Sequence, residues 1–511
     1  MVATISRITD AAAAKSYYEA DDYWSREATG HWHGRAAQAL GLDGEVDPDQ
    51  LVALLRGELP DGTLLGTTRH GVREHAPGWD CTMSAPKSVS VMALIAGDRR
   101  LIDAHTQAVQ AALDYAERHA AAIRLRTSED SVIRVASDNL AIAQFRHATA
   151  RATENGTPAP QLHTHNVILN VTQRDDSAWR SIQSQPLFKL RKAIGAVYHM
   201  ELATDAQRLG YTVTIAPDST FEIDGVPDDV LRTFSPRAAQ IEAALDARGK
   251  SRATASAAEK NVIALDTRAP KEAVDHATLA AAWRSQADAL GFDEDARRRM
   301  VAQAEARAAT RISLDTDPPK HIADRAVAFA TAKISERDAT FSAAQLEAEA
   351  AIAARGHATH ADIVAAIDRA EHAQALVIRP APRMAQGAIG YATRQAVETE
   401  QRMLAMEAEG RARFAPLHGR ISATSVVETA EAASRDRGHG WTEGQRTAAR
   451  GLLMSSANVT ALQGHAGTAK TSTVLATYAD AARDQGLTIR GAAIILRRSL
   501  PNLRHSCDRC T

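Results

Sequence analysis

The sequence predicts an α+β fold in which a mainly antiparallel sheet is flanked by helices. Through residues 1–295, short segments of alternating apolar residues, typical of strands, are interleaved with segments of helical periodicity. Between residues 296–430, Ala, Glu, Arg and Gln dominate and strand patterns vanish, which predicts a helical connector. Over residues 431–511, a glycine-rich loop between an apolar run and a helix predicts the start of an α/β P-loop domain, incomplete in this chain.

The composition is that of a multidomain protein without a disulfide scaffold. A chain of 511 residues with 45% hydrophobic residues is long enough for about two to four domains. Because the formal net charge is -2, a nucleic acid would have to be held by local basic patches. The chain has only 3 cysteines, no signal peptide and no apolar run near the ~20 residues that span a bilayer, so we expect a cytoplasmic protein without membrane insertion.

The first predicted element is a helix that begins near Ala11 and is rich in tyrosine. Tyr17, Tyr18 and Tyr23 lie close together although the whole chain has only 8 tyrosines. A phenol has a pKa of about 10 and becomes an effective nucleophile only when nearby cations neutralise the group it attacks. The alternative is that these rings anchor the helix to the core.

Local patterns predict the next elements: a helix over 35–41 that ends in a glycine turn, a strand over 80–85, a helix after Pro86, a helix over 100–122 and a further strand of the sheet over 131–136. Asp80 opens the first of these strands, where an isolated aspartate is commonly a surface residue. Lys87 begins the helix after Pro86. It is either solvated or placed to reach a DNA backbone.

Two strands that bring three histidines together are central to the prediction. Residues 140–147 and 161–171 have strand-like patterns, and glycine and proline between them let the chain turn back. Alternate side chains share a face of a strand, so His147, His163 and His165 would converge at one edge. Three neutral imidazoles with open positions form a site for a divalent metal. Three satisfied polar residues at a sheet edge are the alternative.

A second H-x-H pair, His31 and His33, has no strand pattern around it, and we expect a surface loop there. The remaining elements predicted for this part are a helix over 186–209 and a small hairpin of strands over 211–215 and 220–223. Arg237 follows in F-S-P-R-A-A-Q-I, which by itself predicts only a helix start.

Four motifs together resemble the MobF-type conjugative relaxases, HUH endonucleases that nick plasmid DNA at an origin of transfer (oriT). They are Tyr-Tyr with a later Tyr near the N-terminus, W-D-C-T-M-S-A-P-K-S-V-S, F-R-H-A-T-A-R and P-Q-L-H-T-H-N, in the order and spacing of the family. Two features depart from it. The loop between His147 and His163 is longer, and the second tyrosine pair is reduced to Tyr23–Trp24, which weakens the case for a two-nucleophile cycle.

This resemblance implies an HUH relaxase domain and a catalytic role for several residues. Tyr17 would be the main nucleophile, and Tyr18, about 100° away on a helix, would not share its role. Tyr23 matches the family's second active tyrosine. Asp80 would hydrogen-bond a metal-ligating histidine, with general base for Tyr17 as the alternative, and Arg151 would add positive charge beside the phosphate.

The resemblance also implies ligands and partners. The three histidines would hold Mg²⁺ or Mn²⁺, with Zn²⁺ possible, and Lys87 and Arg237 would contact DNA. The substrate would be single-stranded and hairpin oriT DNA. Conjugation accessory proteins and a type IV secretion coupling protein would be partners. The protein would be bacterial and would be exported with the transferred strand.

The motif G-H-A-G-T-A-K-T-S has the order of a P-loop, with Gly464, Gly467, Lys470 and Thr471. The preceding N-V-T-A-L-Q predicts a buried strand, and Gln445 resembles the adenine-contacting glutamine of superfamily 1 helicases. However, Ala469 replaces the usual glycine before the lysine. Neither an acidic metal-binding motif nor a second RecA-like lobe follows Lys470, so we expect a vestigial nucleotide site without ATP turnover.

The leading hypothesis is therefore a metal-dependent DNA strand transferase that works through a 5′-phosphotyrosine. A rolling-circle replication initiator shares this chemistry and would act on a replication origin. A P-loop motor with a DNA-binding module, and an inactive DNA-binding remnant of a relaxase–helicase, are the alternatives of other classes.

Overall fold

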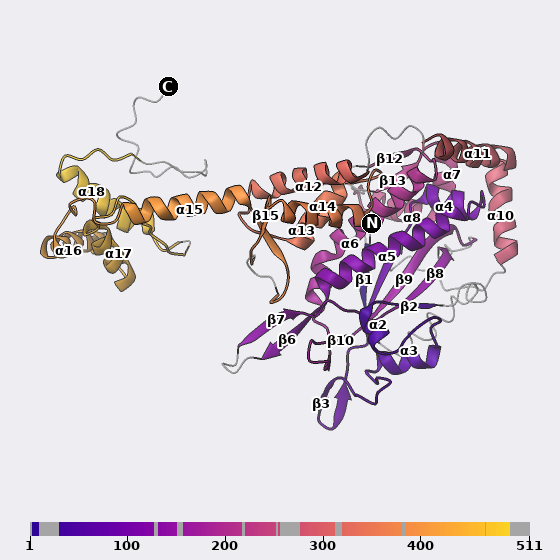
Figure 1. Ribbon diagram of the computed structural model, residues 1–511, viewed down its shortest axis with the longest axis horizontal. Helices are drawn as coiled ribbons and strands as arrows, with labels where there is room; N and C mark the ends of the chain where they lie inside the picture. Colours follow the sequence, from indigo (N-terminus) through magenta and orange to yellow (C-terminus); the bar gives the residue numbers. More distant parts are fainter. Residues whose placement is uncertain are drawn as a thin grey trace. The chain divides into compact units, whose positions relative to one another are not determined.

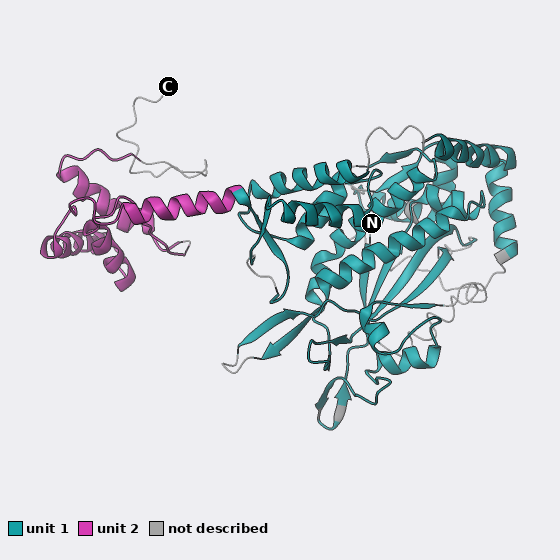
Figure 2. Ribbon diagram, in the orientation of Figure 1, with its two compact units in different colours: residues 1–394 teal, residues 395–511 magenta. Residues whose placement is uncertain are grey.

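The computed structural model describes residues 3–9, 30–126, 131–150, 157–216, 220–251, 254–255, 276–311, 319–380, 385–465 and 467–490. It forms two compact units, residues 1–394 and 395–511 (Figure 2). In the described residues, no helix is both long and apolar enough to cross a membrane.

The first unit is built on a five-stranded sheet with every neighbouring pair antiparallel. In spatial order its strands are β1 (Ala3–Ile8), β5 (Gly78–Ser84), β9 (Pro160–Leu169), β8 (Ile142–Thr149) and β2 (His31–His33). The predicted α+β class and antiparallel sheet are confirmed. The surface loop expected around His31 and His33 is wrong, because this segment pairs with β8 as an edge strand.

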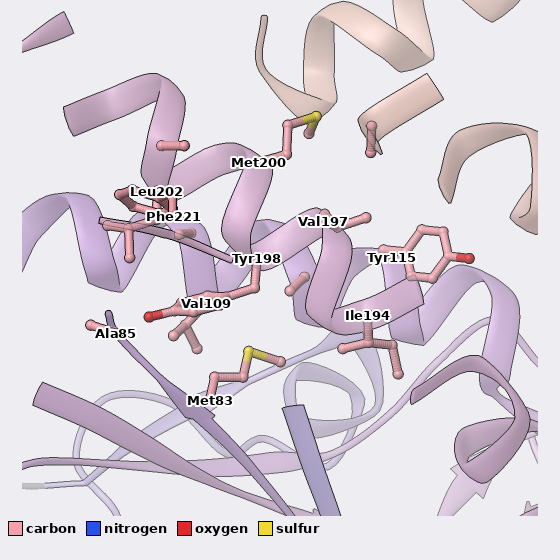
Figure 3. Close-up of a cluster of buried hydrophobic side chains, with 14 of the residues drawn as sticks. Met83, Ala85, Val109, Tyr115, Ile194, Val197, Tyr198, Met200, Leu202 and Phe221 are labelled. Atoms are coloured by element: carbon pink, nitrogen blue, oxygen red, sulfur yellow. The ribbon is translucent and has the colours of Figure 1, made fainter. Parts of the chain in front are cut away.

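Helices cover both faces of this sheet (Figure 1). One face packs against α4 (Lys87–Leu94), α5 (Arg100–Ala120) and α6 (Gln185–Arg208), and the other against α2 (Arg35–Ala39) and α3 (Pro48–Leu55). Figure 3 shows apolar side chains of α5, α6 and β5 meeting in the first of these layers. Each fully buried Leu, Val or Phe there contributes about 1.5–3 kcal/mol.

Strand alternation explains why the two layers receive different side chains. Ile142 and Ile168 face the α5–α6 layer, whereas their neighbours Ala143 and Val167 face the α2–α3 layer. Ala141, Leu169 and Val171 also belong to this second layer, as the pattern predicted. The histidine-bearing face of β8 and β9 is therefore the face covered by α2 and α3.

The described residues of this unit also form four separate two-stranded ribbons: β3 (Thr67–Arg69) with β4 (Val72–Glu74), β6 (Ala122–Arg126) with β7 (Val132–Ala136), β10 (Thr172–Gln173) with β11 (Trp179–Arg180), and β12 (Val213–Ile215) with β13 (Phe221–Ile223). The predicted hairpin is confirmed as β12–β13. The expectation that 131–136 continues the central sheet is wrong, because β7 pairs with β6 in a separate ribbon. The helices that follow in the described residues are α7 (Asp228–Thr233), α8 (Pro236–Asp246), α10 (His276–Ala289) and α11 (Glu294–Arg311).

Residues 319–394 belong to the same core. They form α12 (Pro319–Ser335), α13 (Ala343–Ala354), α14 (His360–His372) and a small sheet of β14 (Phe341–Ser342), β16 (Gly390–Thr393) and β15 (Leu376–Ile378). The region is mostly helical as predicted, but the expected absence of strands is wrong. These strands are short and pair with partners distant in sequence, so the local sequence shows no alternation of apolar and polar residues that would predict them.

Specific contacts join this region to the rest of the first unit. The Tyr115 hydroxyl of α5 donates to the Ala344 carbonyl at 2.8 Å. The buried Glu347 carboxylate lies 2.9 Å from Nε2 of both His119, on α5, and His360, on α14.

The second unit is helical, with α15 (Arg394–Glu409) beginning at the boundary, followed by α16 (Arg420–Asp436), α17 (Glu443–Leu453), the π-helix η1 (Lys470–Leu475) and α18 (Ala476–Asp484). The buried strand predicted for 458–463 is wrong, because these residues have no strand structure and Val459 is 48% exposed. A strand needs a neighbour, and the described residues of this unit contain no strand that could pair with it.

Candidate active site

The pairing of β8 with β9 brings the three predicted histidines to one face of the sheet. His147 lies opposite His163, and Phe145 lies opposite His165. Directly opposed residues of an antiparallel pair share a face, and residues two apart on one strand do so too. The predicted convergence is therefore confirmed. An irregularity in the ladder between His147 and Thr149 ends regular pairing next to the site.

The three rings lie at nearly equal distances from one another. The ring centroids of His147 and His163 are 5.4 Å apart, those of His147 and His165 5.2 Å, and those of His163 and His165 5.1 Å. His147 and His165 are buried, whereas His163 is half-buried. The trio is thus a compact group at the edge of the α2–α3 layer.

Asp80 on β5 holds one of these rings. Its Oδ2 lies 2.7 Å from Nδ1 of His165, and the Thr82 hydroxyl lies 3.1 Å from the same nitrogen. A carboxylate only accepts hydrogen bonds, so Nδ1 of His165 carries a proton, and in the neutral ring Nε2 would be the nitrogen left to ligate a metal. The predicted hydrogen bond between Asp80 and a histidine of the trio is therefore present, with the Asp80 carboxylate as the acceptor. It fixes the ring's orientation and its tautomer.

The backbone sets a second ring in the same way. Nδ1 of His163 lies 2.9 Å from the carbonyl oxygen of Gln161, which can only accept a hydrogen bond. Nδ1 of His163 therefore carries a proton. In two of the three imidazoles, Nε2 is thus the nitrogen left to ligate a metal when the ring is neutral.

The spacing and chemistry of the trio fit a metal ion. Imidazole nitrogens bind Zn²⁺ at about 2.0–2.1 Å, which places the centroids of three ligating rings about 5 Å apart. The observed separations agree with this value. Among the described residues, however, no three His, Cys, Asp or Glu side chains are already arranged to hold an ion.

A buried network behind the trio was not foreseen from the sequence. Thr164, between His163 and His165, points to the other face of β9, where its hydroxyl lies 2.8 Å from Nε2 of His105. Nδ1 of His105 lies 2.7 Å from the Tyr198 hydroxyl. Burial, with Arg146 nearby, lowers the pKa of His105 to about 3, so this ring is neutral. The sequence feature that could have indicated this network is His105, a histidine on the apolar face of the helix predicted over 100–122.

Lys87 lies near the same strand but does not project freely. Its ammonium donates to the Pro160 carbonyl at 2.8 Å, where β9 begins. Burial lowers its pKa to about 8, and Glu222 opposes this shift. Lys87 therefore anchors the start of the strand that carries His163 and His165, and its contact with DNA stays a prediction.

Five predicted site residues cannot be placed by their side chains. Four of them lie outside the described residues: Tyr17, Tyr18, Tyr23 and Arg151. Arg237 lies in α8, but its side chain is not described. The roles of these residues stay predictions.

The predicted P-loop lies in the second unit, and its lysine is hydrogen-bonded to carbonyl groups of the same loop. The Lys470 ammonium donates to the carbonyls of Gly464 and His465, the latter at 2.6 Å. Thr471 lies in the π-helix that begins at Lys470, and Ala469 before it is left-handed with φ 52°. Gly467 also has a positive φ, of 80°. The loop's lysine is thus bonded to carbonyl oxygens of its own loop.

Gln445 is the N3 residue of a capping box with Thr442 at the start of α17. Its side-chain amide also donates to the Thr468 carbonyl at 3.1 Å. The structure therefore brings Gln445 to the P-loop, as the predicted nucleotide site requires.

Comparison with known proteins identifies the family to which the first unit is similar. The model of the TrwC relaxase family matches residues 11–290, and a model of an AAA domain matches residues 440–499. The chain is 39% identical over 309 residues to the multifunctional conjugation protein TraI of Escherichia coli (strain K12), which covers 58% of this chain and 16% of TraI. The chain thus spans about a sixth of the length of this relative.

Solved structures of the conjugative relaxase TrwC in complex with oriT DNA are also similar. A metal-free and a metal-bound form each show 37% identity and a TM-score of 0.52, and each match covers 57% of this chain and 99% of the TrwC chain. The resemblance to conjugative relaxases inferred from the motifs is confirmed. Because the relaxase family model covers more than half of the residues, the chain belongs to the TrwC relaxase family.

Proposed function

We propose that this protein is a conjugative relaxase that nicks and religates one DNA strand at a plasmid origin of transfer. The observation that carries the proposal is the trio of His147, His163 and His165 on adjacent strands, with Asp80 bonded to His165 at 2.7 Å. Similarity to TrwC, solved in complex with oriT DNA, supports the choice of substrate.

In this proposal the Tyr17 hydroxyl attacks the scissile phosphate of single-stranded DNA. A bond forms between the tyrosine oxygen and phosphorus, and the bond from phosphorus to the 3′ oxygen breaks. The phenol's proton ends on the freed 3′-OH. The phosphotyrosine ester retains the bond energy, so the reverse step religates the strand without ATP.

The three histidines would hold a divalent ion, Mg²⁺ or Mn²⁺, with Zn²⁺ as a further option. When bound, such an ion supplies positive charge to the phosphate under attack. Asp80 would keep His165 oriented with Nε2 unprotonated, and Arg151 would add a second positive charge. The metal-bound form of TrwC supports this part of the proposal.

We also propose that the P-loop of the second unit does not turn over ATP. A nucleotide phosphate would first have to displace Lys470 from the carbonyls of Gly464 and His465. Conjugation accessory proteins, a secretion coupling protein and export with the DNA strand belong to the same proposal.

The test is incubation with labelled single-stranded oligonucleotides that span candidate transfer origins, with Mg²⁺ or Mn²⁺ and with EDTA. We expect a covalent protein–DNA adduct that survives denaturing electrophoresis, disappears in EDTA and is absent from Tyr17→Phe. Tyr18→Phe is the matched control and should retain the adduct.

Other results would point to other functions. An adduct that persists in Tyr17→Phe would refute the nucleophile. An adduct only with a replication origin would identify a rolling-circle initiator. Binding without cleavage of any oligonucleotide would identify a DNA-binding remnant.

A further inference from the structure

One face of the β6–β7 ribbon carries arginines in an arrangement that costs stability. Arg124 and Arg134 lie directly opposite each other in the antiparallel register. Arg126 is two residues along β6 and therefore on the same face, about 7 Å away. Like charges directly opposed on a ribbon are destabilising, so this placement indicates a role other than folding.

The first turns of α6 extend this charged face. The backbone N–H of Gln183 donates to the Ala122 carbonyl at 2.7 Å, which places the start of α6 beside β6. Arg134 donates to the Gln185 side chain at 3.4 Å. On a helix, positions i, i+3, i+4 and i+7 share a face, so three further residues line up with Gln185: Phe188, Lys189 and Lys192.

This surface is positively charged and partly aromatic. Phe188 is 43% exposed, although a phenylalanine gains most from burial. The exposed cations of the surface, within the part of the chain that the structure describes, form no ion pair: Arg124, Arg126, Lys189 and Lys192. The sequence between the strands adds Glu129 and Asp130, which lie outside the described residues.

We propose that this face of β6–β7 and the first turns of α6 form a second nucleic-acid site, which holds single-stranded DNA by its phosphates. Arginine and lysine in a row track a phosphate backbone, and an exposed aromatic ring among them offers a base a surface on which to stack. Duplex DNA keeps its bases stacked inside the helix, so it could not use Phe188. The exposed ring therefore favours a single strand.

The proposed site is separate from the histidine trio. β7 leads through residues 137–141 into the start of β8, whereas His147 lies near the end of β8. Ile142 and His147 are thus about 17 Å apart along the strand. Figure 1 shows β6 and β7 projecting from the first unit. The inference rests on the proposed function in taking the ligand to be DNA, but not on cleavage.

The first experiment measures binding of the full chain to fluorescent dT20, which contains no origin, across a salt series. For single strands the slope of log K against log salt is about −0.7 for each phosphate contact. The triple variant Arg124→Ala, Arg126→Ala, Lys189→Ala should therefore have a slope less steep by about 2 and an affinity reduced at least about tenfold.

The matched control removes three exposed cations elsewhere in the first unit. Arg299→Ala, Lys320→Ala, Arg337→Ala has the same change in net charge and should leave the slope unchanged. Arginine-to-lysine and lysine-to-arginine versions of the first variant keep the charge and should retain most of the binding, which excludes misfolding as the cause. Equal slopes for the alanine variant and the wild type would overturn the proposal.

A second variant tests stacking. Phe188→Ala should weaken dT20 binding by about fivefold or more, with the salt slope unchanged. Phe329→Ala is the control, because Phe329 is 60% exposed on α12. If duplex DNA bound this face as tightly as dT20, and Phe188→Ala had no effect, the assignment to single strands would be wrong.

The two proposals can fail independently. If no oligonucleotide is cleaved, yet the dT20 slope falls only in the first triple variant, the second site stands without the relaxase activity. If cleavage of a short oriT oligonucleotide is lost in that variant, the surface is part of the active site and not a second one.

Discussion

The histidine trio and the P-loop differ in what supports them. His147, His163 and His165 lie on central strands of a five-stranded sheet, and Asp80, far away in sequence, holds one ring from a neighbouring strand. The P-loop is bonded mainly to itself and to Gln445, and the described residues directly before it, 454–463, contain no strand. A sequence motif gives the order of the side chains, whereas long-range strand pairing fixes their geometry.

The largest effect should follow from removing a ring of the trio. His163→Ala should reduce adduct formation with an oriT oligonucleotide by more than about 100-fold, since loss of a ligand exceeds the 10–100-fold cost of losing a partner of a ligand. The control is His372→Ala, an exposed histidine on α14. Full activity of His163→Ala would show that the histidine trio is not needed for cleavage.

Buried charge in the first unit predicts a pH dependence of its stability. Burial raises the pKa of Glu201 on α6 from 4.5 to about 7, and its Oε2 accepts from the His360 amide at 2.8 Å. The folded state then binds this proton more tightly than the unfolded state. The stabilisation of the folded state by protonated Glu201 is therefore fully present below about pH 4.5 and is lost as the pH rises through 7.

Urea unfolding at pH 4.5 and pH 8 measures this effect. The wild type should lose up to about 3 kcal/mol of unfolding free energy across this range from Glu201, and Glu201→Gln should lose correspondingly less. Glu400→Gln, an exposed glutamate of the second unit, is the control. Equal pH dependence of wild type and Glu201→Gln would contradict the assignment.

Asp80→Asn should weaken the site without abolishing it. The amide keeps the size of the carboxylate but no longer favours the proton on Nδ1 of His165, so the metal concentration needed for half-maximal adduct formation should rise about 10–100-fold. Excess metal should restore the yield. Asp176→Asn, in the β10–β11 turn, should leave this metal titration unchanged, and an unchanged titration for Asp80→Asn would remove its positioning role.

The smallest effect is expected at the P-loop. Lys470→Ala removes an ammonium that is bonded to the loop's own carbonyls, so adduct formation should equal that of the wild type. ATP hydrolysis stimulated by single-stranded DNA should be absent from both proteins. Hydrolysis by the wild type that Lys470→Ala abolishes would show that this loop works as a motor site.

Local sequence pattern predicted the elements whose signal lies within one segment. Alternation over 140–147 and 161–171 gave β8, β9 and the shared face of the histidines, and Pro86 marked the start of α4. Pairing between distant segments was not predictable in the same way. β2 has only three residues, and its strand character comes from β8.

In the candidate active site, too, the features that lie within one segment could be predicted, whereas contacts between distant segments could not. The periodicity placed the trio, and the family resemblance gave the link from Asp80 to one of its rings. The buried chain from Thr164 through His105 to Tyr198 was not predicted, because its members come from β9, α5 and α6. The anchoring of Lys87 at Pro160 was missed for the same reason.

The packing of residues 319–394 decides where this chain can be cut. Gln386 exchanges backbone hydrogen bonds with Arg134 and Ala136, so it covers the outer edge of β7. A fragment ending at residue 295 would uncover that edge together with the buried side chains of α5 and α6 that now touch α13. Such a fragment should therefore unfold at a lower urea concentration than one ending at residue 394, because it lacks this buried apolar contact.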